Sequence, residues 1–422
     1  MKRTIAWLLA IALGLAAAVY ALNLRGEDPV TADPGPRADA TAIARGAYLA
    51  RVGNCMTCHT ARGGEPYAGG LGIHTPFGTV YTSNLTPDVK TGLGGWSPSA
   101  FWRALHNGRS RDGRLLYPAF PYPNYTHVTR ADSDAIFAYL RSLPAVAQAN
   151  RPHALRFPYD STPALAVWRA LFFKPGQLEP DPRQSADWNR GAYLVRGLGH
   201  CNACHASRNA LGATSGTLDL SGGLIPMRHW YAPSLTAAHE AGVADWSLPE
   251  IVLLMKNGVS AKGTVLGPMA EVVGNSTQHW SDADLLAMAT YLKSLPADTR
   301  PRDVTQVEPP LTDALGARLY KQHCAQCHGD QGEGMAPAYP PLAGNRAVTM
   351  DSPANLVRIV LAGGFAPSTA GNPRPYGMPP FAMVFGNEDT AAVLSYIRSA
   401  WGNQGKPVSS LDVIQLRNGL QD

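Results

Sequence analysis

The sequence has few cysteines, and none of them is free to form a structural disulfide. All six cysteines of the 422 residues fall into three copies of one short pattern, C-x-x-C-H. Because every cysteine has a place in this pattern, we expect no disulfide framework of the kind that holds small secreted proteins together. The fold must instead depend on ordinary hydrophobic cores, and the chain has enough apolar residues to bury several small ones.

The chain also lacks the marks of several large classes of protein. Its 36 Lys and Arg residues and 31 Asp and Glu residues give a formal net charge of +5, but they are dispersed, and no block of like charge occurs. A nucleic-acid partner is therefore not expected. No nicotinamide-binding glycine fingerprint, P-loop or nucleophile elbow is present, so nothing in the chain looks like a substrate-oxidising centre.

Long hydrophobic runs are equally scarce. One run, Ile5–Leu22, follows a basic N-terminus and ends among small residues, which is typical of a secretory signal. It is long for a cleaved signal and short for a membrane span. Cleavage after Ala18 or Ala21 is the favoured interpretation, and retention of residues 1–22 as an anchor is the alternative. Both place the body of the protein on the periplasmic side of the bacterial cytoplasmic membrane, behind a linker at residues 23–40.

The three C-x-x-C-H copies match the attachment signature of c-type haem. In that chemistry the two thiols add to the porphyrin vinyl groups, and the adjacent histidine is the proximal iron ligand. One copy could be a chance match or a redox dithiol, but three copies that use every cysteine predict three covalently bound haem c groups. The predicted attachment residues are Cys55, Cys58, Cys201, Cys204, Cys324 and Cys327, and the predicted proximal ligands are His59, His205 and His328.

The sequence around the motifs is repeated as well. A short helical pattern precedes each motif, and an apolar helix closes each repeat. In the closing helices apolar residues recur at helical spacing, so one face of each should be buried. The leading segments are Gly46–Arg51, Gly191–Arg196 and Gly316–Tyr320, and the closing helices are Asp134–Leu143, Asp282–Leu295 and Glu388–Trp401.

This order of a helix, a C-x-x-C-H motif, a Gly- and Pro-rich middle and a closing helix resembles the class I cytochrome c fold. The resemblance implies a mainly α protein of three tandem domains, each a small helical bundle around a covalently bound haem. The predicted domains are 40–148, 185–298 and 310–403, followed by a C-terminal tail, 404–422.

Two segments outside these domains have more than one interpretation. The Pro-rich joint 149–184 contains Ala166–Phe173, which is expected to form a short apolar helix. It could pack between domains or dock another subunit. The tail 404–422 could cap a domain or lie on a membrane surface.

A haem that only transfers electrons normally has both axial positions filled, and a Met ligand raises its potential. Met269, in the loop before the second closing helix, is the predicted distal ligand of the second haem. Met378 is predicted for the third haem, where Pro379 stiffens the loop that would hold the sulfur toward the iron. Met383 is the alternative in that domain.

The first domain departs from this pattern. No methionine lies between His59 and the end of the closing helix, and Phe120, which cannot ligate iron, stands where a methionine is expected. His127 is the tentative distal ligand, and bis-His ligation would lower the potential relative to His/Met ligation. His106 and His74 are further candidates. The remaining alternative is an iron that is five-coordinate or that binds water in place of a side chain.

Four longer segments of the sequence resemble one particular family. They are similar to the three-haem cytochrome c subunit of membrane-bound bacterial dehydrogenases for alcohols, sugars, sugar acids or aldehydes. In that family a separate catalytic subunit with PQQ, FAD or a molybdenum cofactor oxidises the substrate. The cytochrome subunit takes the electrons, anchors the complex to the membrane surface and passes electrons to ubiquinone or another acceptor. The four segments are Gly108–Gly113, Trp168–Phe173, Arg190–Val195 and Gly267–Val273.

The resemblance implies an electron-transfer subunit that is not catalytic by itself, and two other functions compete with it. An open first haem could bind peroxide or another small ligand, which would suit a peroxidase-like or sulfur-compound oxidoreductase. A free-standing carrier or gas sensor is disfavoured by the three haems and by the lack of a signalling domain. Phe120 departs from the pattern of this family, so the iron ligation that the resemblance implies does not transfer directly to the first haem.

Overall fold

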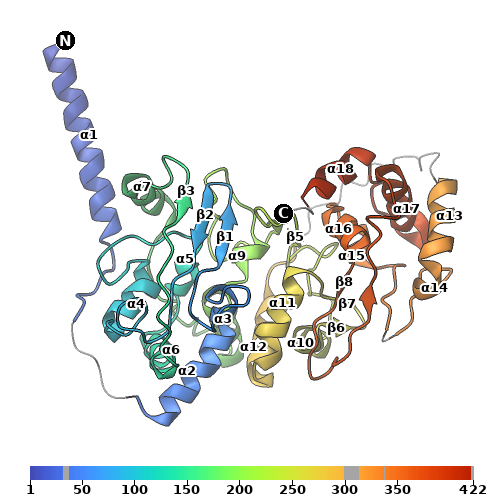
Figure 1. Ribbon diagram of the computed structural model, residues 1–422, viewed down its shortest axis with the longest axis horizontal. Coiled ribbons are helices and arrows are strands. Elements are labelled where there is room, and N and C mark those ends of the chain that lie inside the picture. Colours follow the sequence, from blue (N-terminus) through green and yellow to red (C-terminus); the bar gives the residue numbers. More distant parts are fainter. Residues whose placement is uncertain (32–37, 299–312, 337, 420–422) are drawn as a thin grey trace. The chain divides into compact units, whose positions relative to one another are not determined.

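The computed structural model describes residues 1–31, 38–298, 313–336 and 338–419 (Figure 1). In these residues the protein is mainly α, and its strands are two to four residues long and pair in small antiparallel ladders. The predicted fold class is confirmed. Contacts divide the chain into two compact units: unit 1 is Met1–Arg183, Ala192–Ala203 and Arg208–Leu218, and unit 2 is Gln184–Gly191, Cys204–Ser207 and Asp219–Asp422. The three-domain boundaries stay a prediction.

Unit 1 contains the first motif and one three-stranded sheet in the order β1-β2-β3. Helix α8 (Ala186–Tyr193) runs from unit 2 into unit 1 and continues as a π-helical turn, Leu194–Leu198. The other elements of unit 1 are α1 (Lys2–Asn23), α2 (Ala40–Val52), α3 (Cys55–Cys58), β1 (Gly72–Thr75), β2 (Gly78–Tyr81), α4 (Pro98–Asn107), α5 (Tyr122–Tyr125), α6 (Arg130–Ser142), β3 (Ala154–Leu155) and α7 (Thr162–Phe172).

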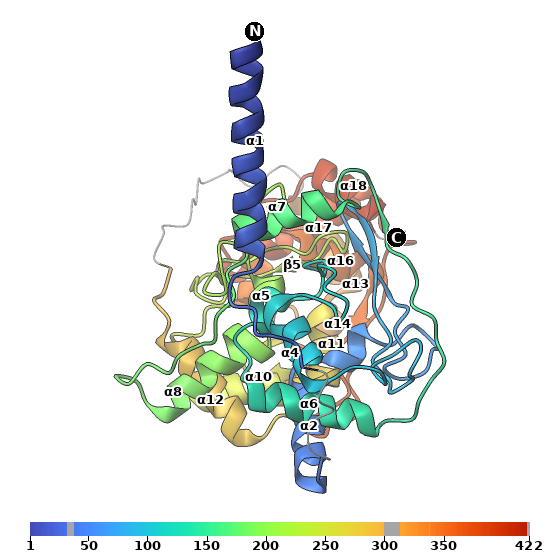
Figure 2. The same cartoon turned by 90° about the vertical axis from the view of Figure 1, so that its left-hand side faces the viewer.

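Helices α2 and α6, the first and last helices of the first repeat, pack against each other (Figure 2). They meet at Gly46, where a Cβ atom would lie 1.8 Å from the carbonyl oxygen of Ala135. Only glycine permits so close an approach of two backbones. Beside this contact the Arg45 Nε donates a 3.0 Å hydrogen bond to Asp132. The class I arrangement of crossed terminal helices is therefore present in this repeat.

Helix α1 is long and apolar enough to cross a membrane, with a mean hydropathy of 2.3 in its most apolar window, and an export signal would have the same properties. Its C-terminal end meets α7 (Figure 1). There Asn23 Nδ2 donates to the Ala166 carbonyl, and Arg169 Nε donates to Asn23 Oδ1, each over 2.9 Å. Arg169 is only 3 % exposed, whereas Val167 and Leu171 of α7 face solvent.

Unit 2 contains the last residues of the second motif and the whole of the third. Helix α9 (Asn202–His205) begins in unit 1 and ends in unit 2. The other elements of unit 2 are β4 (Gly223–Leu224), β5 (Tyr231–Ala232), α10 (Leu248–Asn257), β6 (Val259–Ser260), β7 (Gly263–Thr264), α11 (Pro268–Asn275), α12 (Asp282–Ser294), α13 (Asp313–His323), α14 (Ala325–His328), α15 (Arg346–Thr349), α16 (Ala354–Ala362), β8 (Gly364–Phe365), β9 (Gly377–Met378), α17 (Asn387–Ser399) and α18 (Ser410–Asn418), with 3-10 turns at Thr277–His279 and Ala400–Gly402.

The helix crossing of the first repeat recurs twice in unit 2. A Cβ atom on Gly191 of α8 would lie 2.0 Å from the Ala287 carbonyl oxygen of α12. One on Gly316 of α13 would lie 2.4 Å from that of Ala392 in α17. In all three crossings a tyrosine Cβ, one turn after the alanine, would lie within 2.8 Å of the added atom. All three repeats therefore share one packing geometry.

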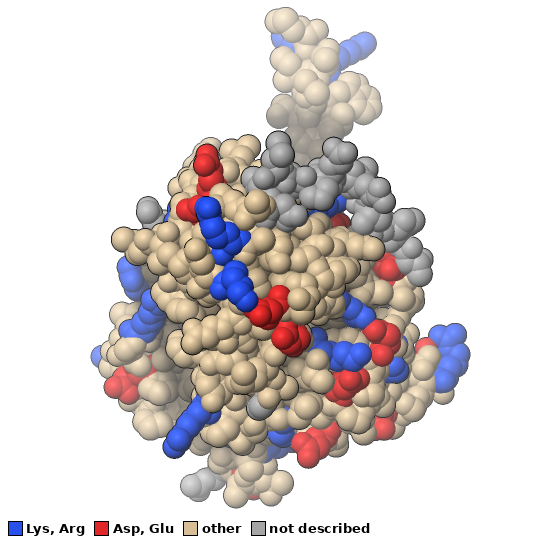
Figure 3. All heavy atoms as spheres, turned by 90° about the vertical axis from the view of Figure 1, so that its right-hand side faces the viewer, with Lys and Arg blue, Asp and Glu red and all other residues tan. Residues whose placement is uncertain are grey.

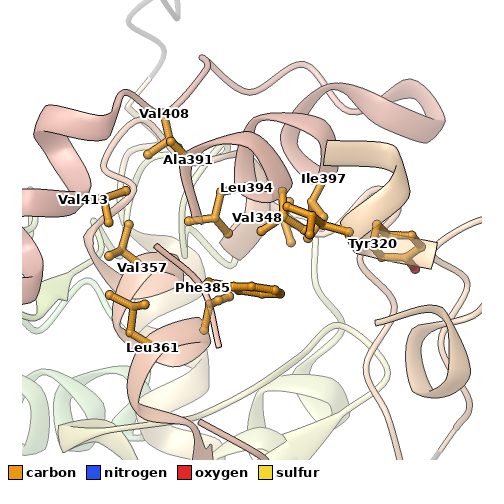
Figure 4. Close-up of a cluster of buried hydrophobic side chains, with 13 residues drawn as sticks. Tyr320, Val348, Val357, Leu361, Phe385, Ala391, Leu394, Ile397, Val408 and Val413 are labelled. Carbon is orange, nitrogen blue, oxygen red and sulfur yellow. The ribbon is translucent and has the colours of Figure 1, made fainter. Parts of the chain in front are cut away.

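The third repeat has a hydrophobic core of its own (Figure 4). Side chains from α13, α16 and α17 meet in it, among them the fully buried Val357 and Leu394. Val413 of α18 is also fully buried there, and Val408 lies beside it. Of the two interpretations of the C-terminal tail, the structure shows the capping of a domain, because α18 covers this core.

Charged side chains of both signs are interspersed on the face shown in Figure 3. In unit 2, Lys321 pairs with Asp330 at 2.7 Å and Lys256 pairs with Asp282 at 3.0 Å. Exposed pairs of this kind stabilise a protein by at most about 1 kcal/mol. The pairing agrees with a dispersed charge distribution.

Candidate haem sites

Each cysteine pair lies on or beside a single short helical turn that directly follows the first helix of its repeat. The turns are α3, α9 and α14, and none of the six cysteines, which all lie in the described part of the chain, forms a disulfide. Burial, followed by the nearby Cys58, raises the pKa of the Cys55 thiol to about 12. Burial, followed by Cys327, raises that of Cys324 to about 11. The nucleophile of a redox dithiol needs a lowered pKa, and Cys55 and Cys324 do not meet that requirement.

The histidine of each motif is oriented by one hydrogen bond. Its Nδ1 lies within hydrogen-bonding distance of a backbone carbonyl oxygen, which can only accept, so Nδ1 carries the proton. The other ring nitrogen, Nε2, is then the one with a lone pair, as a ligand to iron requires. The pairs are His59 with Ser83 at 2.7 Å, His205 with Pro233 at 2.7 Å and His328 with Pro340 at 3.0 Å.

Burial also favours the neutral form of these three histidines. It lowers the pKa of His59, His205 and His328 below the usual range, and the hydrogen bond to the carbonyl opposes this only in part. Only a neutral imidazole binds a metal ion. Each motif therefore presents a histidine in the protonation state and tautomer that a haem iron needs.

The backbone around each histidine is built in the same way in all three copies. The histidine carbonyl accepts a hydrogen bond from a glycine with left-handed φ, and the carbonyl two residues before that glycine accepts one from a leucine. We call this arrangement the histidine frame. Its glycine bonds are Gly69 to His59 (2.8 Å), Gly222 to His205 (2.9 Å) and Gly334 to His328 (2.8 Å), and its leucine bonds are Leu85 to Tyr67 (2.8 Å), Leu235 to Leu220 (2.9 Å) and Leu342 to Gly332 (2.7 Å).

The carbonyl groups that orient the histidines are functional groups that the sequence patterns above do not identify. They lie 24, 28 and 12 residues after their histidines, so spacing from the motif cannot find them. A usable signal is nevertheless present. In every copy the leucine of the histidine frame follows the acceptor residue by two positions, at Leu85, Leu235 and Leu342.

The two predicted distal methionines lie in different local structures. Met378 is in β9, pairs with Gly364 of β8, and packs against the same hydrophobic cluster as Cys324. Met378 and Cys324 therefore border one hydrophobic cluster, whereas Met383 is 98 % exposed. Met269 is the second residue of α11, which begins directly after Gly267.

The histidines proposed for the first haem have other partners. His127 Nδ1 lies 2.9 Å from the Gly176 carbonyl, and its Nε2 lies 3.2 Å from Thr217 Oγ1. His106 is buried and stacks on Trp102 with 4.5 Å between ring centroids. His74, in β1, contacts Thr79 Oγ1 through Nδ1 at 3.1 Å. To bind iron, His127 would have to give up a hydrogen bond.

The donor set fits haem and not a bare metal ion. Among the residues that the structure describes, no group of three or more His, Cys, Asp or Glu side chains could hold a metal ion. A haem supplies four nitrogen donors itself, so that one oriented histidine and two neighbouring thiols are enough to bind it.

Comparison with known proteins gives the same assignment. The cytochrome c family model matches residues 43–144 and 314–401, which contain the first and third motifs. The cytochrome c subunit of the quinone alcohol dehydrogenase of Gluconobacter oxydans is 38 % identical, over 97 % of this chain and 87 % of that protein. The gluconate 2-dehydrogenase cytochrome c subunit of Pantoea cypripedii is 36 % identical, over 90 % of each chain.

The cytochrome subunit of fructose dehydrogenase from Gluconobacter japonicus is 33 % identical, over 92 % of this chain and 85 % of its own length. These similarities extend across all three motifs, including the second, which the family model leaves out. The chain belongs to the family of cytochrome c subunits of bacterial dehydrogenases.

Proposed function

We propose that this chain is a three-haem electron-transfer subunit, which takes electrons from a catalytic dehydrogenase and passes them to ubiquinone or another respiratory acceptor. Its relatives are named as cytochrome subunits of dehydrogenases for alcohol, gluconate and fructose. The observation that carries the proposal is the histidine frame, which is the same at His59, His205 and His328. Three equivalent frames support three haem groups.

The residues would divide the work in a simple way. The cysteine pairs would hold each haem covalently, and the carbonyl-bound histidine would fix the proximal side. Met269 and Met378 would fill the distal positions of the second and third haems. A bound haem supplies an iron that accepts and releases one electron at a time. Apolar side chains such as Phe381, which pack against the same hydrophobic cluster as Met378, would help to exclude water from the third haem.

The partner would be a separate dehydrogenase subunit that uses PQQ, FAD or a molybdenum cofactor, acting on an alcohol, sugar, sugar acid or aldehyde. The apolar helix α1 supports export and a site of action at the periplasmic face of the cytoplasmic membrane. The names of the relatives favour this interpretation over a peroxidase-like or sulfur-compound oxidoreductase.

Haem counting tests the cofactor part of the proposal. The full chain, produced in a host that attaches haem c, should carry three haems by intact mass and by pyridine haemochrome assay. The double variant Cys201→Ala/Cys204→Ala should carry two. A wild-type chain with two haems, and no loss of haem in that variant, would show that the second motif is not an attachment site.

A reduction assay tests the electron-transfer part. Alone, the purified chain should not oxidise alcohols or sugars with an artificial electron acceptor. When it is produced together with a dehydrogenase encoded beside it, the two should copurify, and substrate should reduce the haems. Substrate turnover by the chain without another polypeptide would refute the proposal.

A further inference from the structure

Phe120 stands at the position that Met269 occupies in the second repeat. In both repeats the middle helix ends at a left-handed glycine, Gly108 after α4 and Gly258 after α10. The carbonyl of that glycine accepts a hydrogen bond from Leu116 in the first repeat (2.8 Å) and from Val265 in the second (2.9 Å).

Counting from this shared hydrogen bond gives the register of the two loops. Phe120 follows Leu116 by four residues, and Met269 follows Val265 by four residues. The correspondence between Phe120 and Met269 therefore rests on backbone geometry as well as on the sequence. Because a phenyl ring has no lone pair to donate, the first repeat has no ligand at the position where the second repeat has a sulfur.

Phe120 is connected to the first motif through Tyr125. Its ring centroid is 5.3 Å from that of Tyr125. The Tyr125 hydroxyl donates a 3.3 Å hydrogen bond to the carbonyl of Gly53, two residues before Cys55. An apolar ring beside the first motif suits a neutral guest, because it offers no hydrogen bond to an anion.

The histidines that could replace the missing sulfur already have partners, including His74, which contacts Thr79, and His200, whose Nε2 lies 3.4 Å from the Gly53 carbonyl. The sequence contains no methionine from residue 60 to residue 226. Both ring nitrogens of His127 have hydrogen-bonding partners, Gly176 and Thr217. His106 is held by its stack on Trp102.

We propose that the haem at Cys55, Cys58 and His59 has no side-chain ligand on its distal side, and that this open position, bordered by Phe120, binds a small neutral diatomic ligand. This inference rests on the proposed attachment of haem to the first motif. It gives the three haems different roles: the second and third are closed by methionine, and the first is a ligand-binding site.

Carbon monoxide is the probe for the open position. The reduced wild-type chain should bind one equivalent of carbon monoxide per three haems, and the oxidised chain should show one high-spin haem in three by electron paramagnetic resonance. Phe120→Met should abolish carbon monoxide binding, remove the high-spin signal and add the charge-transfer band of a thioether bound to ferric haem. Phe120→Leu is the matched control and should keep both wild-type properties.

Met378→Ala serves as a positive control, because opening the third haem should raise carbon monoxide binding from one equivalent to two. Three low-spin haems that ignore carbon monoxide in the wild type would overturn the inference. If His127→Ala then opened one haem, His127 would be the ligand instead. Peptide mass spectrometry of the first motif separates the two proposals: unmodified Cys55 and Cys58 would refute haem attachment there, whereas a loaded, closed haem would refute only the open position.

Discussion

At the scale of single residues, the three motifs share the carbonyl contact of their histidines and differ in the residue, Phe or Met, that precedes the closing helix at the proposed ligand position. Cysteine and histidine positions could be read from the sequence because the attachment chemistry fixes their spacing within five residues. The carbonyls of Ser83, Pro233 and Pro340 could not, since chain folding alone brings them to Nδ1 of the histidines. Local chemistry is thus visible in a sequence, and orienting groups become visible only in the fold.

Met378 and Met383 provide a direct comparison of the proposed distal ligand with an exposed methionine. Met378→Ala should remove the thioether charge-transfer band of one haem and lower the potential of that haem, because a Met ligand favours ferrous iron. The shift should be a measurable part of the roughly 0.8 V range that axial ligands span. Spectroelectrochemistry would detect it.

The control in this experiment is Met383→Ala, which changes a side chain that is 98 % exposed. It should leave the optical spectrum and all three midpoint potentials as they are in the wild type. The opposite result, with Met383→Ala altering one haem and Met378→Ala altering none, would reassign the distal ligand of the third haem.

At the scale of helices and strands, periodicity located the closing helices well. The predicted Asp282–Leu295 is α12, Asp282–Ser294, and the apolar segment in the first joint is α7. The remainder of that joint holds a strand, β3, which pairs with β2 through Gly78 and Leu155. A pairing between segments so far apart leaves no periodic trace in a strand of two residues, so the sequence could not reveal it.

The role of the glycines at the three helix crossings could not be predicted from the sequence either, because it depends on a helix that is distant along the chain. In the second repeat, Gly191→Ala would place a Cβ atom 2.0 Å from the Ala287 carbonyl oxygen, so α8 and α12 must separate. Overpacking of this kind costs about 1–3 kcal/mol. We expect the apparent Tm of the haem-loaded chain to fall by several degrees in thermal unfolding followed by circular dichroism.

Gly176→Ala is the matched control for the crossing. A Cβ atom there would have no neighbour within 4 Å, and the backbone of Gly176 is not left-handed. Its Tm should stay within about one degree of the wild-type value, since isolated surface changes are worth about 0.5 kcal/mol or less. Equal stability of the two variants would mean that α8 and α12 do not meet at Gly191.

At the scale of the whole molecule, the repeats are less independent than their sequences suggest. Segment 192–203, which leads into the second motif, belongs to unit 1. There the Tyr193 hydroxyl donates a 2.6 Å hydrogen bond to buried Asp132, and Asn124 donates to Asn202 at 2.6 Å. His200 Nε2 also lies 3.4 Å from the Gly53 carbonyl. The third repeat differs in that its hydrophobic core, among the described residues, draws only on residues 315–416, although Arg346 and Asn355 also donate hydrogen bonds to the Gly242 and Tyr231 carbonyls of the second repeat.

This difference predicts how fragments of the chain will behave. Residues 310–422, exported behind a cleavable signal, should fold alone, bind one haem and unfold cooperatively. Residues 1–183 should be less stable than residues 1–203, although each contains one complete motif, because in the shorter fragment buried Asp132 loses the hydrogen bond from Tyr193 and buried Asn124 loses the one to Asn202. Each buried polar group that loses a partner costs about 1–3 kcal/mol.

The comparison of the two N-terminal fragments isolates segment 192–203 from everything else in the chain. Haem content per mole and the midpoint of urea unfolding should both be higher for residues 1–203. A third fragment, residues 1–203 with Tyr193→Phe and Asn202→Ala, removes the two partners while keeping the length, and it should behave like residues 1–183. If all three fragments proved equally stable, the first repeat would be a self-sufficient domain, and the simple division at residue 148 would be restored.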